Sequence, residues 1–587
     1  MWNTIMDFFP SWTVLIQGLF ILVVPVAITI AVKWLGLKEG QMSRRGIKAA
    51  GRKGGGVPSA QKPGEKVQKG TPSSGGNRDN VQTNTGFGKE EEASGEVFTG
   101  RFQEDLQQFK DITRDMSDVS VREFYIGPLK IKAALFFLAG LTDKEGMDRD
   151  ILKPLMYADR PFEGMTIAPD AASLKDILVH QVILVSEIGY TDHLMKSLQK
   201  VLFGTAVLMV DGMKEVFVLG TPKGRTRGGE EPVSEALLRG PRIGFNETLS
   251  DNTSMLRRHG KTTELAMISF TVGKRVQKEL VLAYMKDIAN QELVEEVERR
   301  IRTIDIDDVQ ESGFVEQLIE DNYLSPFQQI QNTERPDRVM AALLEGRVAI
   351  LLDGTPFALI MPVTFSMLLQ SPEDYYDRWL PGSLLRVLRF FAAFISLFGP
   401  SLYISFLSFH PGLIPTKLVI SILSSRQGVP FPTLIEALIM EVSIEILREA
   451  GLRLPKPIGP AMGIVGGLII GQAAVEAGIV SPILVIVVAV TAISSFSMPM
   501  YSAGITLRLL RFAVMFSAAM FGLYGVILFF LLLISHLIKL KSFGVPYVGV
   551  VVPYRINDWK DFFIRLPLQF MKRRPALLKP KNPIRKG

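Results

Sequence analysis

The chain has 587 residues, of which 47% are hydrophobic and 21% charged, and its mean hydropathy is positive at +0.22. This composition is too apolar for an ordinary soluble enzyme and too charged for a bundle of membrane helices alone, so we expect two unlike parts. The chain contains no cysteine, which excludes disulfides, thiolate metal sites, iron–sulfur clusters and cysteine nucleophiles, and its net charge of +7 is modest for this length.

The first feature along the chain is an apolar run at residues 12–32 that contains no ionisable side chain. About 20 apolar residues cross a hydrocarbon core of ~30 Å, so we predict an N-terminal transmembrane anchor over residues 1–35. A cleaved signal peptide is the alternative, but Asp7 precedes the run and no lysine or arginine does. Lysines and arginines crowd residues 33–69, and the positive-inside rule places that side in the cytoplasm.

Residues 36–100 consist mainly of Gly, Ser, Pro, Asn, Lys and Glu, as in GRKGGGVPSAQKPGEKVQKGTPSSGGNRDN. Such a composition offers too little apolar surface to offset the entropy of ordering, so we expect a disordered, basic, glycine-rich linker. Its basic part has a second interpretation as a segment that contacts anionic lipid headgroups.

Residues 101–380 alternate helical and strand patterns, which predicts a cytoplasmic α+β region of two subdomains split near residues 190–240. Two stretches, residues 205–220 and 348–362, each consist of an apolar run, an Asp-Gly pair and a second apolar run. Asp-Gly tolerates the positive φ angles of a tight turn, so each stretch predicts a β-hairpin. We interpret the similarity as one hairpin per subdomain, the alternative being turn chemistry that coincides by chance.

One helix of this region is predicted at residues 291–304. Its apolar side chains Leu293, Val294, Val297 and Ile301 recur at three- and four-residue spacing, and Glu and Arg side chains fill the other face.

The chain shows no pattern of a catalytic site. The string HGKTT at residues 259–263 resembles the end of a phosphate-binding loop, but Met255 stands where that loop needs a glycine. Asp305, Asp307 and Asp308 suggest a cation site, although alternating Ile-Asp is more typical of a strand edge or turn. The five histidines lack zinc-site spacing, and no nucleophile elbow or dinucleotide fingerprint occurs. We therefore expect no enzyme activity, no metal site and no cofactor.

A second apolar block predicts a transmembrane bundle over residues 386–540. Its clear spans are residues 390–409, 458–479, 480–498 and 512–538, each long enough to cross. Arg378, Arg386 and Arg389 stand at its entry, and a basic tail at residues 541–587 follows its exit. Both flanks are therefore predicted to be cytoplasmic, which four crossings satisfy. Residues 413–454 are apolar but broken by prolines and charges, so a re-entrant hairpin and a surface-lying helix both fit.

The most informative part of this block is a predicted Glu-rich helix at residues 433–450. Glu441, Glu445 and Glu449 share one face at 100° per residue, and Glu436 lies on the other side. Ionisable groups in apolar membrane sequence are costly, so the default interpretation is functional. A ring of such helices would line an aqueous cation path. The alternative is an interfacial helix in which Glu449 pairs with a nearby arginine.

The next helix carries glycines at four-residue intervals, Gly459, Gly463, Gly467 and Gly471. Stacked small residues let two helix backbones approach closely in lipid, so we predict a helix-packing face here, with its partner in the same or a neighbouring subunit.

Several long strings carry a family resemblance: EEPVSEALLRGPRIGFNETL, ELVEEVERRI, SPFQQIQNTERPDRV, LLEGRVAILLDGTPFALIMP, SPEDYYDRWLPGSLLRVLRF, GVPFPTLIEALIMEVSIEILREAGLRLPKPIGPAMGIVGGLIIGQAAVEAGIVSP and SFGVPY. In order, from about residue 120 to about residue 570, the chain resembles the A subunit of GerA-type spore germination receptors.

The resemblance implies a protein of the endospore inner membrane that answers nutrients together with a permease-like B subunit and a lipoprotein C subunit. It also implies self-association into a ring, a pentamer being the expected form, that acts as a nutrient-gated cation channel. Residues 428–457, with Glu441, Glu445 and Glu449, match the family pattern, as does the glycine-rich helix. The span at residues 12–32 and the basic linker depart from it, because members commonly begin with the soluble domain.

Two other functions stay open at this point. A non-conducting scaffold that clusters germination receptors would account for the linker and the extra anchor. A transporter that carries the nutrient itself would account for the proline-broken membrane segments.

Overall fold

The computed structural model describes residues 96–158, 162, 170–221, 231–232, 234–453, 467, 471–549, 551 and 556–585. The chain divides into two units, Met1–Glu91 and Glu92–Gly587, and the described residues all belong to the second. The predicted anchor, nearly all of the predicted linker and most of the predicted span at residues 458–479 lie outside the described residues.

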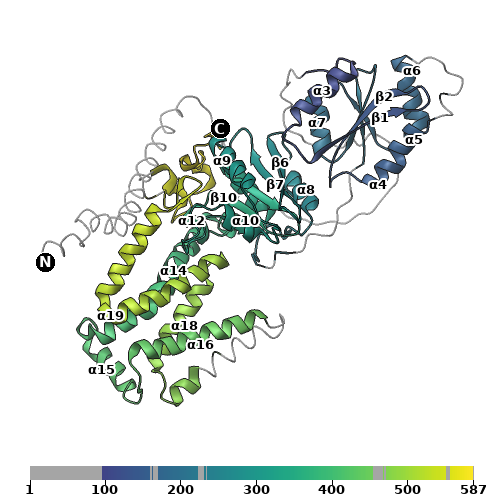
Figure 1. Ribbon diagram of the computed structural model, residues 1–587. Helices are drawn as coiled ribbons and strands as arrows, with labels where there is room; N and C mark the ends of the chain where they lie inside the picture. The colour runs from purple at the N-terminus through teal and green to yellow at the C-terminus, as the bar shows by residue number, and fades with distance from the viewer. Residues whose placement is uncertain are drawn as a thin grey trace, which may run out of the picture. The chain divides into compact units, whose positions relative to one another are not determined.

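The first subdomain is an antiparallel five-stranded sheet in the order β1-β2-β4-β5-β3, with helices on both faces. Helices α3 and α7 cover one face, and α4, α5 and α6 cover the other (Figure 1). Both faces are apolar because alternate side chains of a strand point in opposite directions, and along β4 Val207 packs toward α3 and α7 while Leu208 packs toward α5 and α6. The strands are β1 (Val119–Ile126), β2 (Ile131–Leu138), β3 (Ile188–Thr191), β4 (Ala206–Val210) and β5 (Val216–Leu219), and the helices are α3 (Phe102–Ile112), α4 (Lys144–Met147), α5 (Lys153–Met156), α6 (Ala171–Ile177) and α7 (Leu194–Leu202), with π-helical turns η1 (Asp148–Leu152) and η3 (Leu178–Val182).

The second subdomain repeats this design, with a sheet in the corresponding order β6-β7-β9-β10-β8. Helices α9 and α10 pack on one face, and α8 and α11 on the other. The strands are β6 (Leu265–Val272), β7 (Lys278–Met285), β8 (Gln331–Thr333), β9 (Val348–Leu352) and β10 (Ala358–Met361), and the helices are α8 (Leu249–His259), α9 (Gln291–Arg302), α10 (Ser312–Ile319) and α11 (Pro336–Glu345).

Both predicted hairpins are confirmed, as the neighbouring strands β4–β5 and β9–β10. The turn glycines Gly212 and Gly354 have φ angles of 82° and 86°. These angles lie in the left-handed region, which glycine adopts without strain and which the Asp-Gly pattern predicts. The predicted helix at residues 291–304 is confirmed as α9, with Leu293, Val294, Val297 and Ile301 as its buried residues. The first sheet ends with β5, so the boundary between the subdomains follows Leu219.

The C-terminal part of the chain is helical. It contains α12 (Phe365–Leu369), α13 (Glu373–Tyr376), α14 (Trp379–Ser408), α15 (Thr416–Ser425), α16 (Thr433–Arg453), α18 (Pro482–Phe496) and α19 (Tyr501–Lys539), with the 3-10 turn η4 (Pro411–Leu413). Among the described residues, α14 and α19 are the two helices long and apolar enough to cross a membrane. Helix α18 has 15 residues, fewer than the ~20 that span a bilayer along its normal.

The predicted single span at residues 512–538 is wrong in one respect, because α19 is broken inside it. Gly522 has φ 58° and ψ −140°, and the Ser517 hydroxyl donates to the carbonyl of Gly525 at 2.9 Å. A continuous helix would separate residues eight apart by about 12 Å, so the chain turns back sharply here. Helix α19 therefore has two arms, one before Gly522 and one after it, as its bend in Figure 1 shows.

The open question about residues 413–454 is also answered in part. Helix α16 packs against α14, α18 and α19, and Ala437, Met440 and Glu441 in its first half are buried. The first half of α16 is therefore an interior element of the bundle and does not lie on its surface.

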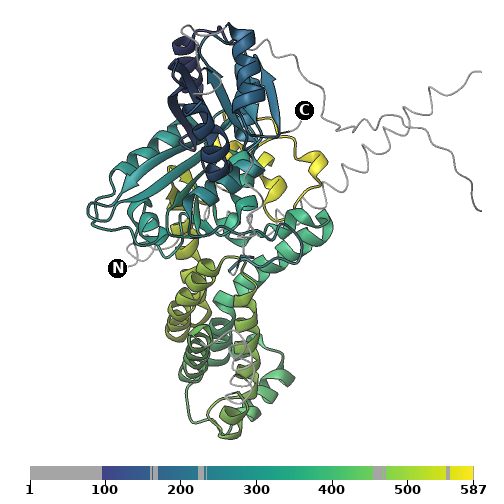
Figure 2. The ribbon, with the colours of Figure 1, turned by 90° about the vertical axis from the view of Figure 1, so that its right-hand side faces the viewer.

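The basic tail folds back onto the second subdomain, and Figures 1 and 2 show this yellow segment beside the teal sheet. The Lys581 amide donates to the carbonyl of Ile288 at 2.9 Å, and the Arg574 guanidinium donates to the carbonyl of Leu344 at 2.7 Å. Its described elements are β11 (Lys541–Ser542), β12 (Val545–Pro546) and the 3-10 turns η5 (Ile556–Asp561), η6 (Leu568–Phe570) and η7 (Ala576–Leu578).

Candidate functional site

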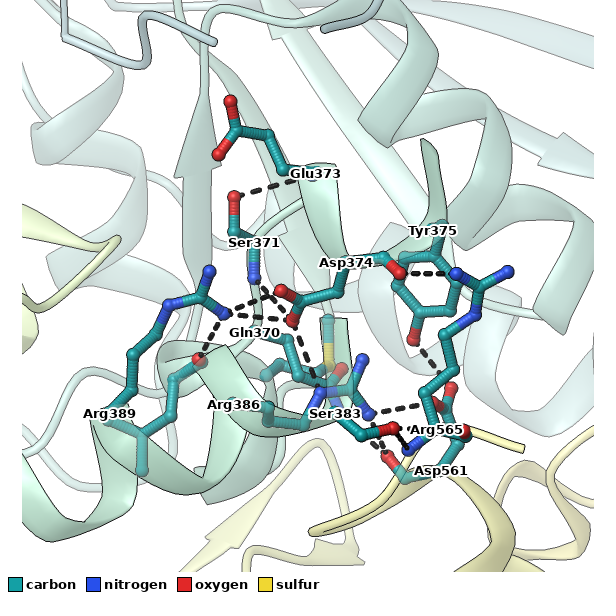
Figure 3. A network of polar contacts seen from close by, with 12 residues as sticks. Gln370, Ser371, Glu373, Asp374, Tyr375, Ser383, Arg386, Arg389, Asp561 and Arg565 are labelled. Atoms are coloured by element: carbon teal, nitrogen blue, oxygen red, sulfur yellow. Dashed lines mark hydrogen bonds and ion pairs between the residues drawn. The ribbon is translucent and has the colours of Figure 1, made fainter. Parts of the chain in front are cut away.

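A buried network of charges lies where the sheet region meets the first long apolar helix (Figure 3). The Asp374 side chain, on α13, is fully buried and accepts from Arg389 at 2.8 and 2.9 Å and from Arg386 at 3.2 Å. Both arginines belong to the first turns of α14, so one carboxylate fixes the start of that helix to the segment before it. Removing either partner would leave a buried charge uncompensated.

The tail completes this network. The Arg386 guanidinium also donates to the Asp561 carboxylate at 2.7 Å, and the Tyr375 hydroxyl donates to the same carboxylate at 2.5 Å. The Arg565 guanidinium donates to the carbonyls of Asp374 and Asp377. Burial raises the pKa of the Tyr375 hydroxyl well above its ordinary value, and the Asp561 charge adds to this, so the tyrosine stays a donor at neutral pH. Segments distant in sequence are thus held at one point.

A glycine makes this close approach possible. A Cβ atom at position 382 would lie 2.8 Å from the Asp374 carbonyl oxygen and 3.3 Å from its Cα atom, and both are backbone atoms that cannot swing aside. The Gly382 position, in the first turn of α14, therefore has no room for a side chain.

A second connection is made by residues 321–329, which we call the junction loop. The Pro326 carbonyl accepts from the Thr506 hydroxyl at 2.6 Å near the start of α19, and Ser325 Oγ lies 2.9 Å from His536 Nε2 near its end. The Gln328 carbonyl accepts from the Tyr547 hydroxyl at 2.6 Å. Since both ends of α19 contact the same loop, its two arms form a hairpin rooted on the second subdomain.

The four predicted ion-path carboxylates all lie on α16. Two of them, Glu436 and Glu441, are fully buried and paired with arginines. Glu441 pairs with Arg511, which lies midway along the first arm of α19. Glu436 pairs with Arg426 at 3.2 Å and accepts from the Ser481 amide, at the start of α18, at 2.5 Å. These pairs join α16 to its neighbours inside the bundle.

The other two carboxylates are progressively more exposed along the helix. The Glu445 side chain is 31% exposed and lies 3.0 Å from Arg448 and 3.9 Å from Arg508. The Glu449 side chain is 62% exposed and pairs with Arg453 at 2.7 Å. The face predicted from helical spacing therefore runs from a buried end at Glu441 to a solvent-accessible end at Glu449, with an arginine opposite each carboxylate. Whether this face lines an ion path stays a prediction.

The glycine face is described only in part, because Gly459 and Gly463 lie outside the described residues. A Cβ atom at Gly471 would lie 3.4 Å from Val485 on α18, and one at Gly467 would lie 3.9 Å from Leu447 on α16. The described end of this face thus lies close to helices of the same chain.

The acidic cluster near residue 305 has basic partners. Asp305 lies 2.5 Å from Lys274, and Asp307 lies 3.3 Å from Arg275. Within the described ranges, no group of three or more His, Asp or Glu side chains is placed to hold a metal ion.

The sequence does not predict the pairing partners in the charged network around Asp374 or those of the α16 carboxylates. The sequence analysis treats Arg386 and Arg389 only as flanking charges and does not name Asp374, Asp561 or Arg511. Asp561 and Arg511 are distant in sequence from their partners, so no local pattern pairs them. The Asp374 case differs, because an acid next to three arginines at the start of an apolar helix is a readable signal.

A profile of the Bacillus/Clostridium GerA spore germination protein family matches residues 107–577, which is most of the chain. The chain belongs to this GerA family. The resemblance stated from the quoted strings is therefore confirmed.

The match covers most of the length of several GerA proteins. The spore germination protein GerLA of Bacillus cereus is 42% identical over 84% of this chain and 98% of its own. Spore germination protein B1 of Bacillus subtilis is 44% identical over 82% of this chain and 98% of its own length. Spore germination protein A1 of the same organism is 47% identical over 64% of this chain and 78% of its own length. A solved structure, the N-terminal domain of the A subunit of the Bacillus megaterium spore germinant receptor GerK3, is 32% identical with a TM-score of 0.36, covering 46% of this chain and 99% of that one.

Proposed function

We propose that this chain is the A subunit of a nutrient-responsive spore germination receptor and that copies of it form a ring, as a nutrient-gated cation channel. The observation that carries the proposal is a carboxylate-bearing helix, α16, inside the apolar bundle of a GerA-family chain. Buried ionisable groups in such a bundle are costly and by default serve function. The chain acts without catalysis, alongside a permease-like B subunit and a lipoprotein C subunit.

The proposed orientation follows the charges. The sheet region and the basic tail lie in the cytoplasm of the spore, and the bundle crosses its inner membrane. Arg386 and Arg389, in the first turns of α14, then lie at the cytoplasmic surface of the membrane, where positive side chains are preferred. A relative, YfkQ of Bacillus subtilis, is itself described as a membrane protein.

The arginine partners suggest how such a channel would stay closed. In the described arrangement Glu441 and Glu445 are each neutralised by an arginine, so their charge is not offered to a cation. We propose that gating moves the first arm of α19 relative to α16, which withdraws Arg511 and frees the Glu441 carboxylate. The junction loop, which contacts both ends of α19, would transmit that movement from the second subdomain.

The test is ion flux from liposomes that contain the full chain together with its B and C partners. Glu445→Gln and Glu449→Gln remove charge at the accessible end of the face, and each should lower the preference for potassium over chloride several-fold, because ring charges concentrate cations. Glu476→Gln is the matched control, since Glu476 is an exposed glutamate outside α16. Unchanged selectivity in both α16 variants would remove these carboxylates from the ion path.

A non-conducting scaffold is the second candidate, and the same arginine partners favour it. Carboxylates that are permanently paired hold helices together and need not meet an ion. This candidate predicts assembly with the partner subunits without any flux, so the liposome measurement separates the two functions.

A further inference from the structure

A cavity of about 520 Å³ lies between the second subdomain and the basic tail. Its lining includes Arg347 and Ser366 from the region before α14, and residues 570–577 and Arg585 from the tail. This volume falls within the range of sites that hold small ligands or single headgroups.

The charge of the lining is strongly positive. Two acidic side chains, Glu345 and Asp561, line the cavity together with six basic ones. The basic side chains are Arg347, Lys560, Lys572, Arg573, Arg574 and Arg585. Both acids are already engaged, since Glu345 lies 3.5 Å from Arg347 and Asp561 lies 2.7 Å from Arg386. Basic side chains therefore outnumber acidic ones in the lining, and this excess of positive charge favours an anion.

Burial disfavours the charged state of two arginines of the lining. It lowers the pKa of Arg347, whose Nε atom lies 3.5 Å from the Glu345 carboxylate. It also lowers the pKa of Arg574, where the Asp287 charge opposes the effect and the Arg585 charge adds to it. An anion in the cavity would stabilise both guanidinium groups.

The position of the cavity suggests where that anion comes from. Gln370 and Asp561 belong both to its lining and to the charged network at the base of α14. Exposed apolar side chains begin directly there, with Leu380 at 63% and Leu384 at 69% exposed, which marks the level at which hydrocarbon would start. A cavity beside this level lies within reach of phospholipid headgroups.

We propose that this cavity binds a phosphate group, supplied by the headgroup of an anionic phospholipid of the surrounding membrane. Lysine and arginine side chains are the usual phosphate partners in proteins, arginine by forked hydrogen bonds and lysine as a point charge. The bound headgroup would bridge the tail and the second subdomain beside α14. This inference does not depend on whether the chain conducts ions.

The test uses the purified full chain in nanodiscs that contain phosphatidylglycerol and phosphatidylcholine, with retained lipid counted by mass spectrometry. The wild type should retain phosphatidylglycerol selectively. The double variant Lys572→Gln/Arg573→Gln removes two exposed cavity charges and should lower this selectivity about tenfold. The control Lys541→Gln/Lys579→Gln removes two exposed lysines outside the cavity and should leave it unchanged.

A second arm distinguishes the two sources of phosphate. Inorganic phosphate is titrated into the chain in phosphatidylcholine nanodiscs and followed by phosphorus NMR. Binding that the cavity variant abolishes, without any lipid selectivity, would keep the phosphate site and contradict the lipid source. Equal lipid retention by the wild type, the cavity variant and the control, with no phosphate binding, would overturn the proposal.

Discussion

Asp118 and Arg257 form a buried ion pair that joins the two sheet subdomains. Asp118 precedes β1 of the first sheet, and Arg257 lies on α8 of the second, with atoms 2.7 and 2.9 Å apart in a forked arrangement. Arg257 also donates to the carbonyl of Leu265 at 2.7 Å. Both side chains are almost inaccessible, so neither can turn to water if the other is removed.

We therefore predict that Asp118→Ala lowers the free energy of unfolding of the sheet region by about 3–5 kcal/mol, because it leaves the buried guanidinium without a counter-charge. Hydrogen exchange of β1 and α8 in the full chain measures the effect. Glu123→Gln, which breaks the exposed pair with Lys110, should cost only about 0–1 kcal/mol. Equal costs for the two variants would contradict this account of the subdomain contact.

Glu316, on α10, predicts a pH dependence. Burial raises the pKa of this carboxyl from 4.5 to about 7, with smaller contributions from Glu320 and Glu311 and an opposing hydrogen bond from Gln328. Because the folded chain retains a proton that the unfolded chain has released, the stabilisation is complete below pH 4.5 and is lost as the pH rises through 7.

The free energy of unfolding should therefore fall by roughly 1–3 kcal/mol over that interval through Glu316. Glu316→Gln should reduce this slope, measured as hydrogen exchange of α10 against pH. It should leave the part that Glu320 contributes, because burial also raises the pKa of that carboxyl to about 7. Glu295→Gln, at an exposed position on α9, should leave the slope as in the wild type. A slope that persists unchanged in Glu316→Gln would show that another group titrates.

At the scale of elements, the hairpin of α19 depends on Gly522. Its backbone angles fall in a region that is essentially restricted to glycine, and a Cβ atom there would lie 2.8 Å from the Phe409 side chain. The Gly522→Ala variant should lose about 1–3 kcal/mol of stability or more, seen as a lower unfolding temperature in detergent. Gly412→Ala, at a nearby glycine with open space around it, is the control and should behave as the wild type.

Helix α16 allows a sharper separation of structure from conduction. Glu441→Gln leaves Arg511 buried without a counter-charge and should destabilise the bundle by about 3–5 kcal/mol, whereas the double change Glu441→Leu/Arg511→Met should restore most of the stability. The unfolding temperatures of the two variants and the wild type in detergent measure these differences in stability. If Glu441→Gln is as stable as the wild type, the pair does not hold the bundle together.

The elements that the sequence predicts well are those with local patterns. The hairpins β4–β5 and β9–β10 follow from Asp-Gly between apolar runs, and α9 follows from its apolar spacing. The sequence does not predict the break at Gly522, because glycine is common in membrane helices and the neighbouring Phe409 is far away in sequence. The carboxylates of α16 were found, but their arginine partners were not, because pairing across helices leaves no spacing to detect.

At the scale of the whole molecule, the charged network around Asp374 and the junction loop connect the sheet region to α14 and α19. A movement of the second subdomain therefore reaches both helices through polar contacts at the helix ends that lie next to the sheet region. The Asp-Gly pattern predicts one hairpin in each subdomain, but it does not predict the strand order that the two sheets share.

The most direct test of this account is potassium release from liposomes that contain the full chain with the proposed B and C subunits, recorded before and after addition of a germinant nutrient. The account predicts no release at rest, release when nutrient is added, and none when this chain is omitted. A complete, assembled receptor that binds nutrient and still passes no potassium would contradict it.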